Sequence, residues 1–152
     1  MKVEDIEFYG AEVYFPQDMK EFWSSVGFPE SEGWKMHLDH CTLGHRSNMT
    51  IETLLSAYMN REERCELTID AVGRYTLPKD KGEGEVIAFR VKNNRVVVDD
   101  YSMKGENNTF HITAFTKGDA KPKDSNEIRD WELMGEMKLS GRIKFWMKKR
   151  EN

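Results

Sequence analysis

Two short stretches of the sequence share one pattern, a histidine followed two residues later by a threonine. They are His40-Cys41-Thr42 and His111-Ile112-Thr113. In a β-strand, residues i and i+2 point to the same face, so each stretch places an imidazole beside a hydroxyl, with an apolar residue on the opposite face. Imidazoles transfer protons near neutral pH, and hydroxyls hydrogen-bond to phosphoryl oxygens. Two such strands brought together would suit the cleavage of a phosphodiester.

The flanks of both triplets fit strands. Leu38 and Leu43 surround the first triplet, and Phe110, Ala114 and Phe115 surround the second. A single His-x-Thr is weak evidence, because an ordinary strand can carry a hydrogen-bonded histidine. Two copies on apolar strands, in a chain with only 4 histidines, are more specific. The pair therefore favours a catalytic role.

The remaining histidines, His37 and His45, raise the alternative of a metal site with His40. The sequence contains no HExxH, CxxC or carboxylate cluster of the kind that binds zinc. On a regular strand, His37 would also face away from His40, because the two are an odd number of residues apart. We therefore expect neither a metal nor another cofactor.

Composition and charge indicate the broad class. The 152 residues are expected to form one domain, residues 1–152, without disulfide or metal support. The net charge of −4 argues against a general nucleic-acid binder, which needs a basic surface. Cys41 and Cys65 are too few for a disulfide framework, so reduced thiols are expected. The stretch Met1–Asp5 lacks an apolar signal region, and no apolar run reaches about 18 residues, so we expect a soluble, cytoplasmic protein.

Hydrophobic spacing and turn residues predict the elements that must position the triplets. Irregular alternation of helices and strands favours a mixed α+β fold with antiparallel pairing. Helices are expected from Pro16 to about Val26, after a cap at Ser47 or Asn48, and after a cap at Asp124. Residues Ile6–Phe15 are expected to form a strand pair or one bent strand, with a bulge at Gly10. The other expected strands are Trp34–His45, Leu67–Val72, the hairpin Val86–Val91 and Val96–Tyr101, Thr109–Thr116, and Met137–Met147.

Apolar residues at regular spacing predict the faces that these elements bury. The first strand is expected to bury Phe8, Val13 and Phe15. The first helix is expected to bury Met19, Phe22, Trp23 and Val26. The second helix is expected to bury Ile51, Leu54, Leu55, Tyr58 and Met59.

The two triplets resemble the paired signatures of the 2H phosphoesterases, enzymes named for two H-x-T/S strands. The stretch from His111 to Thr116, continuing to Lys121–Asn126, is similar to the branch that includes RNA-repair phosphodiesterase domains. The size and layout of the chain resemble most the anti-CBASS protein 1 family of tailed bacteriophages. The resemblance covers about Tyr9 to Trp146. It implies a two-lobed α+β fold, mostly antiparallel sheets with helices packed outside, and a pseudo-two-fold active-site cleft.

The resemblance also implies a metal-independent phosphodiesterase that opens the cyclic di- and trinucleotides, such as cGAMP, that bacteria use as antiviral signals. Such an enzyme would act in the cytoplasm of the host bacterium. Its catalytic residues would be His40, Thr42, His111 and Thr113. A ribose 2′-hydroxyl would attack the neighbouring 3′-5′ phosphodiester, with one histidine as base and the other as acid. The threonines would hold the phosphoryl oxygens, and either histidine could be the base.

A cyclic dinucleotide offers two bases for stacking and two phosphates for cations. Our candidates for stacking are Tyr9, Tyr75 and Trp146, with ordinary packing as the alternative for each. Lys121 could contact a phosphate, and Glu136 could accept hydrogen bonds from a guanine edge or a ribose. For both charged residues, an ordinary surface position is the simpler interpretation.

Two other functions remain open. An RNA 2′,3′-cyclic phosphodiesterase of RNA end repair would use the same residues, although the acidic net charge weighs against long RNA. A protein that sequesters a cyclic nucleotide without cleaving it would need a pocket but no paired histidines. No long nucleic acid and no membrane is expected as a partner.

Overall fold

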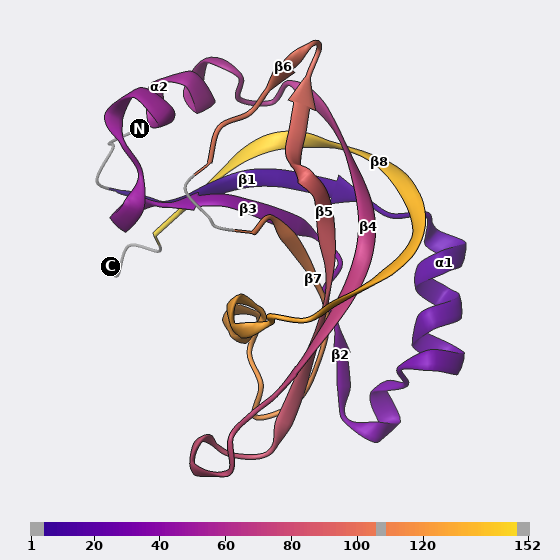
Figure 1. The fold of residues 1–152 in the computed structure, drawn as a ribbon. Coiled ribbons are helices and arrows are strands. Elements are labelled where there is room, and N and C mark those ends of the chain that lie inside the picture. The colour runs from indigo at the N-terminus through magenta and orange to yellow at the C-terminus, as the bar shows by residue number, and fades with distance from the viewer. Residues whose placement is uncertain (1–4, 106–108, 149–152) are drawn as a thin grey trace.

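The computed structural model describes residues 5–105 and 109–148, apart from the side chains of residues 26 and 46. In this part of the chain the strands form one antiparallel 8-stranded sheet, with few helices (Figure 1). This confirms the mixed α+β class with antiparallel pairing. The strands are β1 (Ile6–Tyr14), β2 (Trp34–Met36), β3 (His40–His45), β4 (Arg64–Thr76), β5 (Gly84–Val98), β6 (Tyr101–Ser102), β7 (His111–Gly118) and β8 (Trp131–Met147).

The sheet closes on itself into a barrel. Its order is β2-β7-β3-β1-β8-β4-β5-β6, and β7 also pairs with β5, so β7, β3, β1, β8, β4 and β5 form a closed 6-strand ring. The 17-residue strand β8 curves around the ring and pairs with both β1 and β4 (Figure 1). Closure joins β7 to a strand on either side, which fixes the surroundings of the second triplet.

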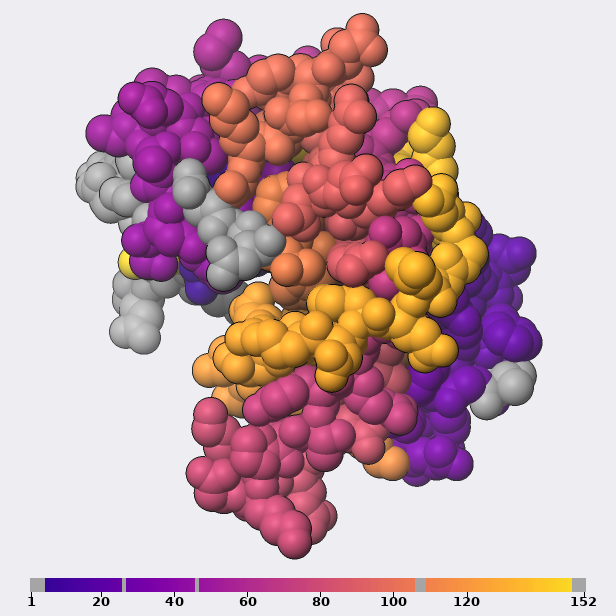
Figure 2. All heavy atoms as spheres, viewed as in Figure 1, coloured from indigo at the N-terminus to yellow at the C-terminus, as the bar shows by residue number. Residues whose placement is uncertain are grey.

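The helical elements are short. α1 (Gln17–Phe22) continues into a π-helical turn, η2 (Trp23–Gly27). α2 (Ile51–Met59) begins after Thr50, whose hydroxyl accepts a hydrogen bond of 3.1 Å from the backbone N–H of Thr53. The remaining short segments are 3-10 turns: η3 (Glu30–Glu32), η4 (Arg46–Asn48), η5 (Lys79–Lys81) and η6 (Pro122–Glu127). The β4–β5 hairpin, with η5 at its tip, projects beyond the body of the molecule (Figures 1 and 2).

Two helix predictions need correction. The predicted cap at Ser47 or Asn48 is wrong, because Asn48 lies in η4 and its side chain accepts from the backbone N–H of His45 at 3.0 Å. The helix predicted after Asp124 is instead the 3-10 segment η6, within which Asp124 accepts from the backbone N–H of Lys121 at 2.7 Å. The side chains of Asn48 and Asp124 therefore each cap a short 3-10 turn and not an α-helix.

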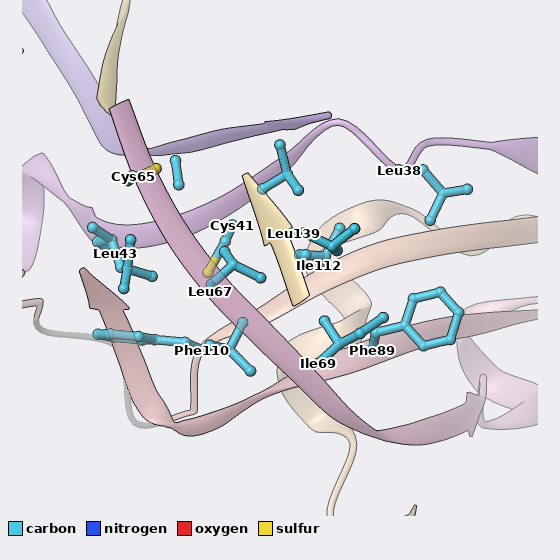
Figure 3. Packing of buried hydrophobic residues seen from close by; sticks show 14 of the residues in the cluster. Leu38, Cys41, Leu43, Cys65, Leu67, Ile69, Phe89, Phe110, Ile112 and Leu139 are labelled. Carbon is cyan, nitrogen blue, oxygen red and sulfur yellow. The ribbon is translucent and has the colours of Figure 1, made fainter. Parts of the chain in front are cut away.

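The barrel interior is the hydrophobic core, in which side chains from β3, β4 and β7 meet (Figure 3). Along β3, Cys41 and Leu43 are fully buried, whereas His40 and Thr42 are half-buried. The second triplet alternates in the same way, with Ile112 fully buried between its two polar residues. Alternation along both strands therefore turns the histidines and threonines to the outside of the barrel.

The bulge predicted at Gly10 is confirmed. The pairing of β1 with β3 shifts register between Tyr9 and Gly10. A Cβ at Gly10 would lie 2.1 Å from the carbonyl oxygen of Cys41. Only glycine lets β1 approach β3 this closely, beside the first triplet.

The sequence also predicts two strand boundaries wrongly. Leu38, with a φ of 48°, interrupts the stretch predicted as one strand and separates β2 from β3. The hairpin predicted at residues 92–95 does not form. Asn93 and Asn94 are both left-handed, with φ of 57° and 50°, and they bulge out while β5 continues in the same direction. Pairing with β4 on both sides of the bulge keeps β5 one strand.

The predicted apolar faces of the helices are only partly buried. On α2, Leu54 is buried, but Ile51, Leu55 and Met59 are 76%, 58% and 80% exposed, because the helix packs through the side that carries Leu54 and Ala57. On the first helical stretch, Met19 and Trp23 pack against the core, whereas Phe22 is exposed. The side chain of Val26 lies outside the described part. Within the described residues, no helix combines the length and apolar character needed to cross a membrane.

Candidate functional site

The two triplets lie on neighbouring antiparallel strands. Cys41 of β3 pairs with Ile112 of β7. One residue to either side, this register sets His40 opposite Thr113 and Thr42 opposite His111. Directly opposed side chains have Cβ atoms roughly 4.5–5.5 Å apart, so the four polar groups form a compact square with local two-fold symmetry.

A cavity of about 230 Å³ lies over this square, and all four side chains line it. Its wall is completed on one side by residues from β1 and β3, and on the other by residues of η6. These further residues are Phe8 and His45, and Pro122, Lys123, Ser125 and Asn126. The described residues of the lining therefore include three imidazoles and one ammonium, with no carboxylate. The cavity suits an anion, although the chain as a whole carries a net charge of −4.

Both ring nitrogens of His111 are engaged. Its Nδ1 lies 2.9 Å from the carbonyl oxygen of Thr109, and its Nε2 lies 2.8 Å from Oγ of Ser125. A carbonyl only accepts, so Nδ1 carries the proton and Nε2 of the neutral ring is the basic nitrogen. Burial lowers the pKa of His111 below its ordinary 6.5; the Thr109 carbonyl opposes this and His40 adds to it. His111 is thus neutral at pH 7, the state that a general base requires.

His40 has a different partner. Its Nδ1 lies 2.8 Å from Oδ1 of Asp39, and the carboxylate can only accept. This hydrogen bond from His40 lowers the pKa of Asp39, against the opposing effect of burial. The His40 side chain is 27% exposed and that of Asp39 is 65% exposed, so the carboxylate lies on the solvent side of the pair. The carboxylate holds Nδ1 and orients the His40 ring, which leaves Nε2 as the nitrogen that can exchange a proton with a ligand.

The threonines supply hydroxyls on both strands. Oγ1 of Thr113 lies 3.1 Å from Oγ of Ser125 and 3.3 Å from the carbonyl oxygen of Pro122. These are long for hydrogen bonds between oxygens, so little is lost if the Thr113 hydroxyl turns toward another acceptor. Thr42 lies diagonally across the square and also lines the cavity. Together they offer two donors to an oxyanion bound between the histidines.

Two aromatic rings border the square on the side of His40. The ring of Phe8 stacks on that of Trp146 with a centroid separation of 4.8 Å and an interplanar angle of 12°. The centroid of the His40 ring lies 5.4 Å from that of Phe8 and 5.0 Å from that of Trp146. We call Phe8 and Trp146 the aromatic shelf. Both rings are half-buried, so part of each remains open for stacking.

Comparison with family models, curated proteins and solved structures found no match. The arrangement of side chains therefore carries the functional argument. It brings together His40, Thr42, His111 and Thr113, the four residues that the sequence singled out as catalytic. Trp146, a predicted stacking residue, also lies against this group.

The other two predicted stacking residues lie elsewhere. Tyr9 is 0% exposed in the barrel core, where its hydroxyl donates to the carbonyl of Lys104. Alternation along β1 turns Tyr9 inward and its neighbour Phe8 outward, so the assignments of Phe8 to the core and Tyr9 to the ligand are both wrong. Tyr75 is half-buried against the small cluster of Leu77, Val86 and Ala120, and it does not line the cavity.

The charged candidates are also displaced from the site. Lys121 is exposed and outside the lining, whereas Lys123, two residues later on η6, lines the cavity. Glu136 forms an ion pair with Lys92 and does not line the cavity. The third histidine near the square is His45, while His37 is hydrogen-bonded to Thr116 at 2.8 Å and lies outside the lining. Within the described residues, no three His, Cys, Asp or Glu side chains are grouped to hold a metal ion.

Three contributors to the site were not found from the sequence. Asp39 adjoins the first triplet, and a carboxylate next to a candidate histidine is a signal that could have pointed to it. Phe8 was missed because its strand face depends on the bulge at Gly10. Ser125 was missed because its contact with His111 is made only when η6 folds back over β7.

Proposed function

We propose that this chain is a metal-independent phosphodiesterase of the 2H phosphoesterase kind, which cleaves the 3′-5′ bonds of cyclic di- and trinucleotides. The observation that carries the proposal is the square itself. Two histidines with different hydrogen-bond partners and two threonines line one cavity on paired strands. The local two-fold relation of β3 and β7 is also what a pair of 2H lobes would require, here within a closed barrel.

The partners of the two histidines support a division of roles. His111, half-buried and neutral, is the base for the proton of the ribose 2′-hydroxyl, and that oxygen attacks the adjacent phosphorus. His40, whose Nδ1 is paired with Asp39, donates a proton from Nε2 to the leaving 5′-oxygen. The hydroxyls of Thr42 and Thr113 stabilise the charge that develops on the non-bridging oxygens. The product carries a 2′,3′-cyclic phosphate, which water can open to a 3′-phosphate with the histidine roles exchanged.

Two features of the cavity favour a nucleotide substrate. Its imidazoles and Lys123 suit the phosphate, and the aromatic shelf beside His40 offers a face for a base. The resemblance to phage anti-CBASS proteins adds the biological setting. In that setting the enzyme removes cyclic nucleotide signals in the host cytoplasm and lets a phage evade defence.

The test compares three substrates: a 3′-5′ cyclic dinucleotide, a cyclic trinucleotide, and an RNA that ends in a 2′,3′-cyclic phosphate. We expect linear products from the cyclic nucleotides, with or without excess EDTA, and no cleavage when the attacking 2′-hydroxyl is replaced by hydrogen. Cleavage of the RNA end alone would replace the proposal with RNA end repair. Recovery of intact cyclic nucleotide from a denatured complex would indicate sequestration, and strong inhibition by EDTA would indicate a metal mechanism.

A further inference from the structure

The hydroxyl of Ser125 makes three hydrogen-bond contacts, one of them with Nε2, the basic nitrogen of His111. Its Oγ lies 2.8 Å from Nε2 of His111, 3.1 Å from Oγ1 of Thr113 and 2.6 Å from the carbonyl oxygen of Pro122. The residue is only 2% exposed, yet it belongs to the cavity wall. Its hydroxyl therefore lies between the square of catalytic candidates and the backbone of η6.

These contacts give the Ser125 proton two acceptors. When His111 is neutral, its Nε2 can accept from Ser125, because the proton on Nδ1 is already held by the carbonyl of Thr109. When His111 is protonated, Nε2 becomes a donor to Oγ, and the Ser125 proton can turn to the carbonyl of Pro122. Both protonation states of His111 are thus hydrogen-bonded without movement of a heavy atom. A group that is partly withdrawn from water and must change its charge during a reaction needs such an arrangement, because an unpaired polar group is costly there.

The same geometry limits how a substrate can reach the base. A neutral imidazole offers one lone pair, in the plane of the ring at its unprotonated nitrogen. With Oγ of Ser125 at 2.8 Å from Nε2, a substrate hydroxyl cannot make the same hydrogen bond unless Ser125 leaves. Ser125 is held in η6 by its own hydrogen bond to Pro122 and lies against Thr113. The nearest group that can receive the substrate proton is therefore Oγ of Ser125.

We infer that Ser125 is a further catalytic residue that relays the proton from the attacking hydroxyl to His111. This inference rests on the proposed function. In the step, the substrate O–H bond breaks and its proton passes to Oγ of Ser125, while the proton of Ser125 passes to Nε2 of His111. The substrate oxygen forms its bond to phosphorus, the bond from phosphorus to the leaving oxygen breaks, and that oxygen takes the proton of His40. Ser125 ends with one proton, as it began, and no oxidant or other reactant is needed.

The test combines the substitution Ser125→Ala with a proton inventory, the dependence of kcat on the deuterium content of the solvent. For the wild type, the three protons that move in the step predict a strongly curved plot, and the loss of one of them in Ser125→Ala should reduce the curvature. For Ser125→Ala we expect kcat to fall by roughly 10²-fold, the lower end of what proton transfer by a positioned group supplies, with little change in KM. Ser125→Thr keeps the hydroxyl and should retain both the curvature and most of kcat, which also covers the case that the alanine variant does not fold. Ser31→Ala, a change at an exposed serine of η3, is the matched control.

The outcomes separate the relay from the proposed function. If wild-type protein cleaves no phosphodiester, both fail. If it does cleave, and Ser125→Ala has an unchanged or increased kcat, the proposed function stands and the relay is overturned, because substrate then reaches His111 directly. A loss of kcat in Ser125→Ala with an unchanged curved inventory would also overturn it, since Ser125 would then only position His111.

Discussion

Cys41 and Ile112 face each other across the pairing of β3 with β7, and both side chains are fully buried. Because side chains alternate along each strand, this single inward pair directs His40, Thr42, His111 and Thr113 to the same outward face. A shift of one residue in either strand would send one histidine into the core and separate the two triplets. The site therefore depends on a register that the core itself fixes.

Replacing either histidine of the square tests the proposed function most directly. His40→Ala and His111→Ala should each lower kcat for a cyclic dinucleotide by roughly 10²–10⁴-fold, because each removes one proton transfer from the reaction. Rates are measured by chromatography of the products. His37→Gln, outside the cavity, is the matched control and should keep the wild-type rate. Near-normal activity in either alanine variant would contradict the acid–base assignment.

The pH dependence should reflect the burial of His111. Its lowered pKa keeps the ring neutral, and so able to act as a base, at pH values below the ordinary 6.5. The acidic limb of kcat/KM should therefore have its midpoint below pH 6.5, and activity should be lost only as the pH falls through that lower value. Initial rates measured from pH 4.5 to 9 give the midpoint. A midpoint well above 6.5 would be incompatible with a buried, neutral base.

Asp39 should contribute modestly through His40. Asp39→Asn removes the carboxylate that accepts from Nδ1 of His40 and orients its ring, so kcat should fall. Because Asp39 is 65% exposed, we expect a loss of only a few-fold, since exposed ion pairs contribute about 0.2–1 kcal/mol. The rate of Asp80→Asn, a change on the distant η5 turn, serves as the reference. A rate equal to that of the reference variant would mean that Asp39 does not position His40.

The aromatic shelf should bind a base. Phe8→Leu preserves an apolar side chain but removes the ring that stacks on Trp146. Loss of one stacked base costs about 1–3 kcal/mol, so the Kd of a 2′-deoxy, non-cleavable cyclic dinucleotide should rise roughly 5- to 150-fold. Calorimetric titration measures this Kd. Tyr75→Leu, which lies away from the cavity, should leave it unchanged, and equal effects of the two substitutions would argue against a specific shelf.

Gly10 should be required for stability. In Gly10→Ala the new methyl would lie 2.1 Å from the carbonyl oxygen of Cys41, so β1 and β3 would have to separate. We expect a loss of about 1–3 kcal/mol in the free energy of unfolding, as for other overpacked sites. Urea titration followed by circular dichroism measures it. Gly135→Ala in β8, where nothing lies within 4 Å of the added Cβ, should change stability by less than about 0.5 kcal/mol.

Patterns of residue type and spacing predicted the structure correctly where residues close together in the sequence determine it. The alternation around Cys41 and Ile112 placed both triplets on strands, and Gly10 marked a bulge. The tandem asparagines Asn93 and Asn94 predict a hairpin turn by the same reasoning, yet β5 continues through them. Whether two left-handed residues reverse a strand or only bulge it depends on whether the next residues pair with the same neighbour, and here β4 holds both sides.

Patterns in the sequence could not predict which residues pack against segments that are distant along the chain. Tyr9 and Phe8 are adjacent aromatic residues on one strand, and their chemistry alone favoured Tyr9 as the ligand-facing one. In the closed barrel, Tyr9 lies on the inward face of β1 and Phe8 lies on the outward face, so Phe8 is the residue that can face a ligand. The exposed apolar residues of α2 show the same limit, because helical spacing identifies an apolar face but not how much of it a neighbour covers.

By itself the sequence determined which side chains could do the chemistry and that each histidine shares a strand face with a threonine, because residue type and spacing are properties of the local chain. Only the tertiary structure decided that the two strands are neighbours, that His111 is partly withdrawn from solvent, and that Ser125 lies against its Nε2. Those differences arise from burial and contacts between segments far apart along the chain, which exist only once the barrel has closed.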